Sequence, residues 1–111
     1  MDLELTGKVV IITGGSDGLG KAAAKRMAME GAKVALAARD QTRLDSAIAE
    51  IKVATGSNDV IGVSTDVTDE SQVVRMVDTV VGTWGGIDIL VNNAGTSASG
   101  KFEDIAIDTW K

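Results

Sequence analysis

Residues 9–20 read VVIITGGSDGLG, and this stretch decides the fold. Its first four residues form a short apolar run, which is typical of a strand buried on both faces of a parallel sheet. Residues 19–30 are rich in Ala, Lys, Arg and Met, which favour a helix. The glycine-rich segment between the two therefore joins a buried strand to a helix.

Three glycines of this loop have separate expected uses. Gly14 permits a tight turn out of the strand, and Gly18 leaves room for the pyrophosphate of a ligand to approach the backbone. Gly20 allows the helix to pack close to the sheet. Because the start of a helix offers unpaired N–H groups and a partial positive charge, the loop is predicted to bind a phosphate rather than only to connect two elements.

The alternation of strand and helix continues downstream. Further strands are expected over three apolar segments, residues 33–38, 60–64 and 87–91. Helices are expected after Asp40 and after Thr68 or Asp69, where apolar residues recur at helical spacing, and Gly31 is expected to end the first helix. Residues 102–111 look like the start of another helix. This order predicts one α/β domain over residues 1–111, with a parallel sheet and helices on both faces.

Composition excludes several kinds of chemistry. The chain has 111 residues and no His, Cys, Tyr or Pro, so it holds no disulfide, no imidazole-bound zinc and no Ser-His-Asp triad. Its formal net charge of −5 argues against nucleic acid as a partner. Apolar runs fall far short of the ~18 residues of a membrane span, and the N-terminus shows no signal-peptide pattern. We expect a cytoplasmic protein without a metal site or a membrane partner.

Two classes of nucleotide-binding loop compete for the glycine segment. Gly15, Gly20 and Lys21 match the G-x-x-x-x-G-K spacing of a P-loop NTPase, but Ala22 stands where Ser or Thr would hold magnesium. The G-x-G-x-x-G spacing of a common dinucleotide loop is not met either. The segment that begins at Thr13 instead matches T-G-x-x-x-G-x-G. A P-loop NTPase is therefore the less favoured alternative.

Two further motifs follow the third and fourth expected strands. They are Asp66-Val67 and residues 92–95, which read Asn-Asn-Ala-Gly. With the three motifs in this order, the chain resembles the N-terminal, cofactor-binding part of the short-chain dehydrogenase/reductase family. The resemblance implies a Rossmann-type doubly wound parallel sheet, incomplete, with about four strands in the order 3-2-1-4 and three to four helices. It also implies hydride transfer between a nicotinamide dinucleotide and a carbonyl or alcohol substrate.

The resemblance carries over a set of cofactor-binding residues. These are Gly14, Ser16, Asp17, Gly18, Leu19, Gly20, Arg39, Asp66, Val67, Asn93, Ala94 and Gly95. The glycine loop is expected around the adenosine and pyrophosphate, and residues 93–95 along the ribose on the nicotinamide side. Asp66 is expected to accept a hydrogen bond from the adenine amino group, and a turn or helix-start role is its alternative. Asn92 and Thr13 are interpreted as structural residues.

The choice between NADP(H) and NAD(H) depends on the end of the second strand. An acidic residue there would bind the ribose hydroxyls of NAD, but the position holds Ala38 and Arg39 follows it. Since a guanidinium can bind a 2′-phosphate through two hydrogen bonds, NADP(H) is favoured. The negative charges of Asp17 and Asp40 weigh against this choice, and an ordinary surface arginine is the alternative.

The catalytic residues of the family have no counterpart here. Family members use a Ser, a Tyr-x-x-x-Lys pair and an assisting Asn, and this chain contains no tyrosine. We therefore assign no catalytic residue, expect a truncated chain without turnover, and keep a non-catalytic nucleotide-binding module as an alternative. The fourth strand would form a sheet edge, so we expect marginal stability or an assembly that covers it. The complete enzyme is expected to be a homo-oligomer.

Overall fold

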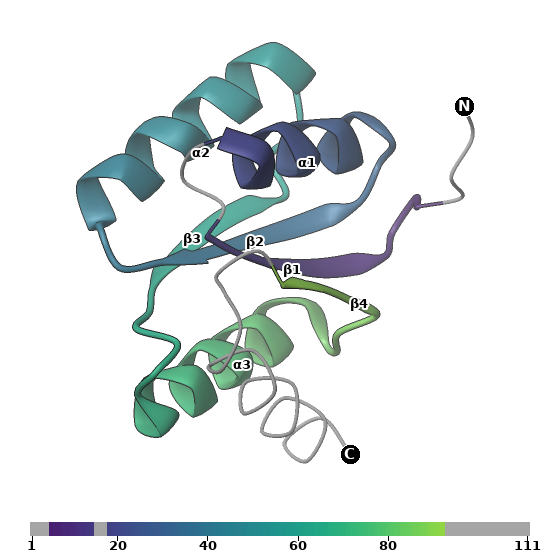
Figure 1. Ribbon diagram of the computed structural model, residues 1–111. Helices are drawn as coiled ribbons and strands as arrows, with labels where there is room; N and C mark the ends of the chain where they lie inside the picture. The colour runs from purple at the N-terminus through teal and green to yellow at the C-terminus, as the bar shows by residue number, and fades with distance from the viewer. Residues whose placement is uncertain (1–4, 15–17, 93–111) are drawn as a thin grey trace.

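A computed structural model describes residues 5–14 and 18–92 of the chain. Strands and helices alternate along it (Figure 1). The elements are β1 (Val9–Thr13), α1 (Gly18–Met29), β2 (Lys33–Ala38), α2 (Gln41–Thr55), β3 (Val60–Ser64), α3 (Glu70–Trp84) and β4 (Ile89–Asn92). The expected helix over residues 102–111 lies outside the described residues.

The four strands form one parallel sheet in the order β3-β2-β1-β4, which confirms the predicted topology. The register aligns the carboxyl ends of the strands, because Thr13 lies opposite both Ala37 of β2 and Asn92 of β4. Ala38 at the end of β2 lies opposite Ser64 at the end of β3. Loops that leave these strands therefore start from one edge of the sheet.

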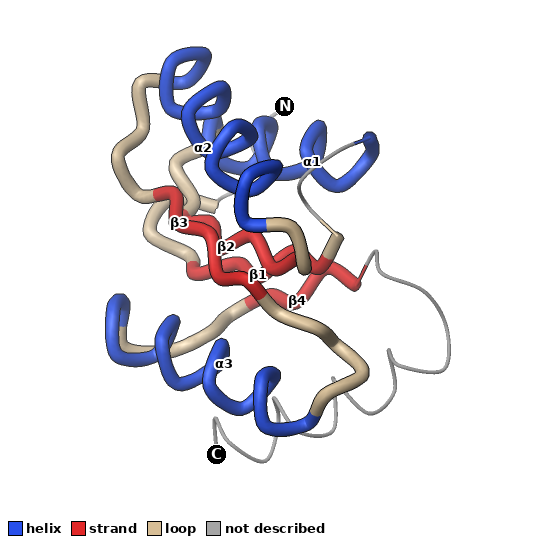
Figure 2. Tube along the Cα trace, turned by 90° about the vertical axis from the view of Figure 1, so that its left-hand side faces the viewer, coloured by secondary structure: helices blue, strands red, loops and turns tan. Residues whose placement is uncertain are grey.

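Helices cover both faces of the sheet. α1 and α2 lie on one face and α3 lies on the other (Figures 1 and 2). Val10 and Ile12 of β1 pack in a cluster with residues of α1 and α2, whereas Val9 and Ile11 pack in a second cluster with residues of α3. Burial on both faces explains why the strand sequences are continuously apolar rather than alternating.

Acidic residues begin two of the helices as expected. The side chain of Asp40 accepts a hydrogen bond from the Arg43 N–H at the start of α2, and Asp69 accepts N–H bonds at the start of α3. The structure thus selects Asp69 over Thr68 as the N-cap, because the Thr68 hydroxyl and N–H both donate to Asp66. Each cap satisfies backbone donors that the first helical turn leaves unpaired.

The expected fourth strand, residues 87–91, is displaced in the structure. β4 begins two residues later and extends to Asn92. Asp88 meets Val9 in a different way, because the Asp88 N–H donates to the Val9 carbonyl and the Asp88 carboxylate accepts the Val9 N–H, each at 2.9 Å. A side chain therefore takes the place of one backbone acceptor at the start of this strand pair. Among the described strands, β4 pairs with β1 alone.

No helix in the described part of the chain is long and apolar enough to cross a membrane.

Candidate functional site

At the carboxyl edge of the sheet there is a point from which the strand connections lead to opposite sides. From β1 the chain passes through α1 to β2 on one side, whereas from β3 it passes through α3 to β4 on the other side of β1 (Figure 1). In open α/β sheets such a switch point opens a crevice at the carboxyl ends, where ligands bind. β1 and β4 flank it here, and the glycine loop starts at the end of β1.

Two glycines of the loop have backbone conformations that favour glycine. Gly14 and Gly18 have φ angles of 66° and 58°, in the left-handed region that favours glycine. The Gly14 N–H donates to the Ala37 carbonyl at 2.7 Å, which ties the start of the loop to β2. Ser16 and Asp17, also predicted as cofactor-binding, lie outside the described residues.

The start of α1 offers a surface that an anion can approach. α1 begins at Gly18 and has no acidic residue in its first turn. A Cβ placed on Gly18 would meet no described atom within 4 Å, and the Leu19 side chain is exposed, whereas Gly20 is buried against the fold. Unpaired N–H groups and the positive end of the helix dipole are general features of a helix start and favour an anion there. These residues fit the phosphates of a dinucleotide.

Asn92 and Thr13 link the two strands beside the crevice. The Thr13 hydroxyl donates to Asn92 Oδ1 at 3.1 Å, and Thr13 is fully buried. This contact confirms the structural role predicted for both residues. Asn93, Ala94 and Gly95, predicted along the nicotinamide ribose, lie outside the described residues.

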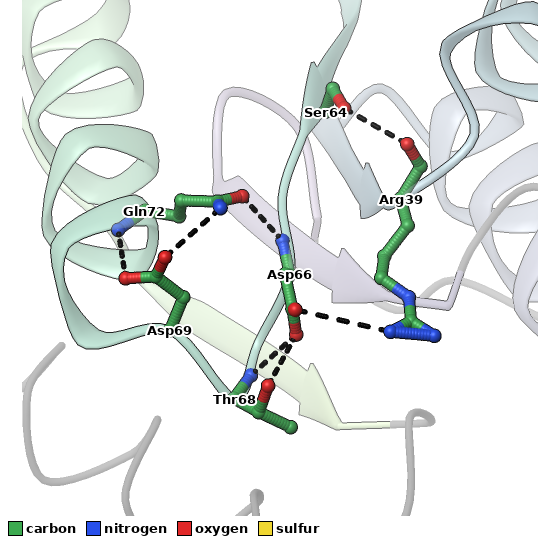
Figure 3. Close-up of polar contacts among 6 residues, drawn as sticks. All are labelled: Arg39, Ser64, Asp66, Thr68, Asp69 and Gln72. Atoms are coloured by element: carbon green, nitrogen blue, oxygen red, sulfur yellow. Dashed lines mark hydrogen bonds and ion pairs between the residues drawn. The ribbon is translucent and has the colours of Figure 1, made fainter.

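Arg39 is held at the end of β2 by its backbone, while its side chain is exposed. The Ser64 hydroxyl donates to the Arg39 carbonyl at 3.0 Å (Figure 3). The Thr65 N–H donates to the Ala38 carbonyl at 2.8 Å. The Arg39 side chain is 75% exposed. The guanidinium therefore lies in solvent on an anchored backbone. Sequence reasoning missed Ser64, although its position opposite Ala38 follows from aligning the ends of neighbouring parallel strands.

Asp66 has the turn role, which is one of the two alternatives that the sequence left open for it. Its Oδ1 atom accepts hydrogen bonds from the Thr68 hydroxyl at 2.6 Å and from the Thr68 N–H at 2.9 Å, which makes it a turn residue. Its Oδ2 atom lies 3.9 Å from a guanidinium nitrogen of Arg39 (Figure 3). Val67 packs its side chain into the cluster on the α3 face.

Hydrogen bonds keep the Asp66 carboxyl ionised. The Thr68 hydroxyl, then the Thr68 N–H, and further the charge of Arg39 hold the pKa of Asp66 below its ordinary value. An ionised carboxylate only accepts hydrogen bonds, so a ligand group at Oδ2 must be a donor. An amino group on an aromatic base has that property.

The contact between Arg39 and Asp66 is weak. Both groups are solvent-accessible, and pairs of this kind contribute little net free energy. Asp40, whose charge was expected to disfavour a phosphate nearby, accepts the N–H of Arg43 and lies 3.8 Å from the Arg43 Nε. This carboxylate is thus engaged at the start of α2.

Lys21 does not occupy the position that a P-loop lysine needs. Its Nζ atom lies 2.9 Å from Glu50 Oε2 of α2, and the hydrogen bond and charge of Lys21 lower the pKa of Glu50. A P-loop lysine instead directs its amine to the phosphates of the nucleotide. The arrangement in this structure favours a dinucleotide over a nucleoside triphosphate.

The sequence model of the short chain dehydrogenase family matches residues 8–111. The chain is 41% identical over 106 residues to a 2,5-dichloro-2,5-cyclohexadiene-1,4-diol dehydrogenase of Sphingobium indicum, covering 96% of this chain and 42% of that protein. It is 37% identical over 106 residues to an uncharacterised oxidoreductase of Staphylococcus aureus, covering 96% and 44%. The chain thus spans less than half the length of these relatives.

Solved structures with the same fold hold both kinds of nicotinamide dinucleotide. L-Sorbose reductase from Gluconobacter frateurii, complexed with NADPH and L-sorbose, matches with a TM-score of 0.81 and 45% identity, over 86% of this chain and 36% of that one. NAD⁺-bound xylitol dehydrogenase matches with a TM-score of 0.83 and 28% identity, over 96% and 48%.

Proposed function

This chain belongs to the short-chain dehydrogenase family, and we propose that it is the NADP(H)-binding part of an enzyme that transfers hydride between that cofactor and a carbonyl or alcohol substrate. The observation that carries the cofactor choice is the end of β2, where an exposed arginine stands on an anchored backbone and no carboxylate takes the ribose-binding position. A cytoplasmic location and a homo-oligomeric complete enzyme stay part of the proposal.

Each end of the cofactor has a proposed set of partners. The N–H groups at the start of α1 and the open backbone at Gly18 would hold the pyrophosphate. Arg39 would bind the 2′-phosphate through its guanidinium, and Asp66 would accept the adenine amino group beside the Val67 backbone. The proposal also includes Ser16 and Asp17 beside the adenosine and pyrophosphate, and residues 93–95 beside the ribose on the nicotinamide side. The bound cofactor supplies the hydride chemistry, and this chain contributes binding and orientation.

Relatives alone leave the cofactor choice open. The L-sorbose reductase structure contains NADPH and the xylitol dehydrogenase structure contains NAD⁺. NADP(H) is therefore proposed from Arg39 itself. A guanidinium can meet a phosphate through two parallel hydrogen bonds, whereas the free ribose hydroxyl of NAD(H) offers it no charge.

Arg39→Ala tests the cofactor choice. We expect the affinity for NADPH to fall about tenfold to 100-fold, since a charge-assisted contact is lost, while the affinity for NADH changes about twofold or less. Isothermal titration of both cofactors into the wild type and the variant measures this. Arg75→Ala, on the exposed side of α3, is the control and should leave both affinities unchanged. Equal wild-type affinity for the two cofactors, with no effect of Arg39→Ala on NADPH, defeats the proposal.

A non-catalytic nucleotide-binding module is the second candidate, because the chain contains no tyrosine. In this family a tyrosine phenol beside a lysine moves the proton that accompanies hydride transfer. We propose that residues 1–111 by themselves bind cofactor without turnover. Oxidation of NADPH in the presence of a panel of aldehydes and ketones, followed by absorbance, should show none; clear turnover refutes this part of the proposal.

A further inference from the structure

We propose that Gln72 is a positioning residue for adenine recognition, because its amide fastens Asp66 to the start of α3. The inference rests on the proposed function, in which Asp66 accepts the adenine amino group. Neither the glycine loop nor the family motifs include Gln72. It lies in the first turn of α3 and is half-buried.

The two ends of the Gln72 amide hold two different acidic residues. Its Oε1 atom accepts the Asp66 N–H at 2.9 Å, and its Nε2 group donates to Asp69 Oδ2 at 3.1 Å (Figure 3). Asp69 in turn accepts the N–H groups of Ser71 and Gln72 through its other oxygen. The loop before α3 is thereby closed into one hydrogen-bonded unit.

This arrangement departs from the usual capping box. There the third helical residue bonds the N–H of the N-cap residue itself. Here the Asp69 N–H donates instead to the Asp66 carbonyl at 3.0 Å, and Gln72 reaches past it to the Asp66 N–H. This hydrogen bond ties Asp66 to the start of α3. An ordinary capping box would not include that residue.

The consequence is that the Asp66 carboxylate has a set direction. The Asp66 N–H donates to the Gln72 amide oxygen, the Asp66 carbonyl accepts the Asp69 N–H, and Asp66 Oδ1 accepts the Thr68 hydroxyl. Its Oδ2 atom has only the weak contact with Arg39 at 3.9 Å among the contacts described here. A ligand amino group thus meets an acceptor that is already oriented, so less conformational entropy is lost on binding.

Only an amide of this length satisfies both partners. The Asp66 N–H needs an acceptor and the Asp69 carboxylate needs a donor, and Gln supplies one of each. Glutamate keeps the acceptor but brings a second negative charge to Asp69. Methionine keeps the length and the helix propensity but removes both hydrogen bonds.

The test uses two dinucleotides that differ at one position of the base. NADPH carries the adenine amino group, and its hypoxanthine analogue carries a carbonyl oxygen there, which cannot donate to Asp66. Both are titrated into the wild type, Gln72→Met, Gln72→Glu and the control Gln41→Met. Gln41 also lies in the first turn of a helix and its Nε2 donates to Asp45, but it has no contact with Asp66 in the described hydrogen bonds.

We expect the wild type and Gln41→Met to prefer NADPH over the analogue by about tenfold, which is the size of one hydrogen bond to a charged group. In Gln72→Met this preference should fall to about twofold, and in Gln72→Glu to about threefold. The loss should arise from weaker NADPH binding, with the affinity for the analogue nearly constant. A merely structural role of Gln72 would weaken both ligands equally.

The outcomes separate the inference from the function on which it rests. A wild type that binds neither dinucleotide overturns the proposed function, and the inference with it. Equal affinity of the wild type for both dinucleotides would show that Asp66 does not accept the adenine amino group. Gln72 would then have no role in adenine recognition. A wild-type preference that persists in either folded Gln72 variant, or an equal loss for both ligands, overturns the inference alone. Circular dichroism establishes which variants are folded.

Discussion

At the scale of single residues, the acidic side chains at the carboxyl edge are as informative as the glycines. Asp66 was expected either to bind a ligand or to form a turn. Its Oδ1 atom forms the turn, and the proposed ligand contact would use its Oδ2 atom. Asp69 serves the helix start and, through Gln72, the orientation of Asp66. The D-x-x-Q spacing of Asp69 and Gln72 is a recognisable helix-start signal. Nothing in that spacing shows that the amide reaches Asp66.

The titration of these carboxylates predicts how folding responds to acid. The Thr68 contacts lower the pKa of Asp66, and the Ser71 hydroxyl, with the Gln72 amide next, lowers that of Asp69. A carboxyl with a lowered pKa in the folded state stabilises the fold above its unfolded pKa, and this stability is lost as the pH falls through the folded pKa. We therefore expect the melting temperature to decrease as the pH is lowered below about 4.

Asp69→Asn tests this pH dependence because asparagine still caps a helix but does not titrate. The melting temperature of the variant should fall less than that of the wild type between pH 5 and pH 3. Asp78→Asn, on the exposed side of α3, removes the same charge away from this network and is the control. An equal decrease in melting temperature for the wild type and Asp69→Asn would show that Asp69 contributes nothing to the acid response.

At the scale of elements, sequence patterns predicted the elements well and their ends less well. Continuous apolar runs located the strands because both faces of the sheet are covered, and period 3.6 located α2 and α3. β4 starts late because Asp88 replaces backbone pairing with a side-chain contact, which no propensity encodes.

Two contacts at the carboxyl edge were missed from the sequence, although the place of Ser64 beside the end of β2 follows from the alignment of the strands. Ser64 and Arg39 are 25 positions apart, and they meet because the register of β2 and β3 aligns their ends. Gln72 reaches Asp66 only when the intervening turn is folded so that the Asp69 N–H is already taken. Tertiary geometry decides both contacts. The glycine loop was predictable because its requirement is local.

A side chain at Gly31, between α1 and β2, is predicted to destabilise the fold. Its φ angle is 90°, and an added Cβ would lie 3.2 Å from the Thr6 Cα atom. Gly31→Ala should lower the free energy of unfolding by about 1–2 kcal/mol or more, because a left-handed conformation and a backbone contact are both penalised. Urea denaturation measures this value.

Gly82→Ala is the matched control for that prediction. Gly82 lies inside α3 with open space around it, so alanine there should raise the free energy of unfolding by about 0.5–1 kcal/mol. The two substitutions are chemically identical and should act in opposite directions. Destabilisation by Gly82→Ala, or neutrality of Gly31→Ala, would contradict the described backbone.

At the scale of the whole molecule, the order of the strands creates the site. The sequence resemblance implied the order 3-2-1-4, and the structure confirms it. β1 lies between β2 and β4, which are reached through helices on opposite faces, and a switch point of this kind at the carboxyl edge is where open α/β sheets bind ligands. The same parallel register brings the ends of β2 and β3, with Arg39 and Asp66, to that edge. The proposed class of ligand follows from the family, and its proposed place follows from the fold.

The central claim is that a nicotinamide dinucleotide binds at the carboxyl edge, and titration of the ¹⁵N-labelled protein with NADPH, followed by amide chemical shifts, tests it most directly. The account predicts shifts for the amides of Gly14, Leu19, Arg39 and Asp66, and constant positions for those of Lys8 and residues 58–59 at the opposite edge. Saturable shifts confined to the carboxyl edge would support the claim. A spectrum unchanged by millimolar NADPH, or shifts centred on the opposite edge, would contradict it.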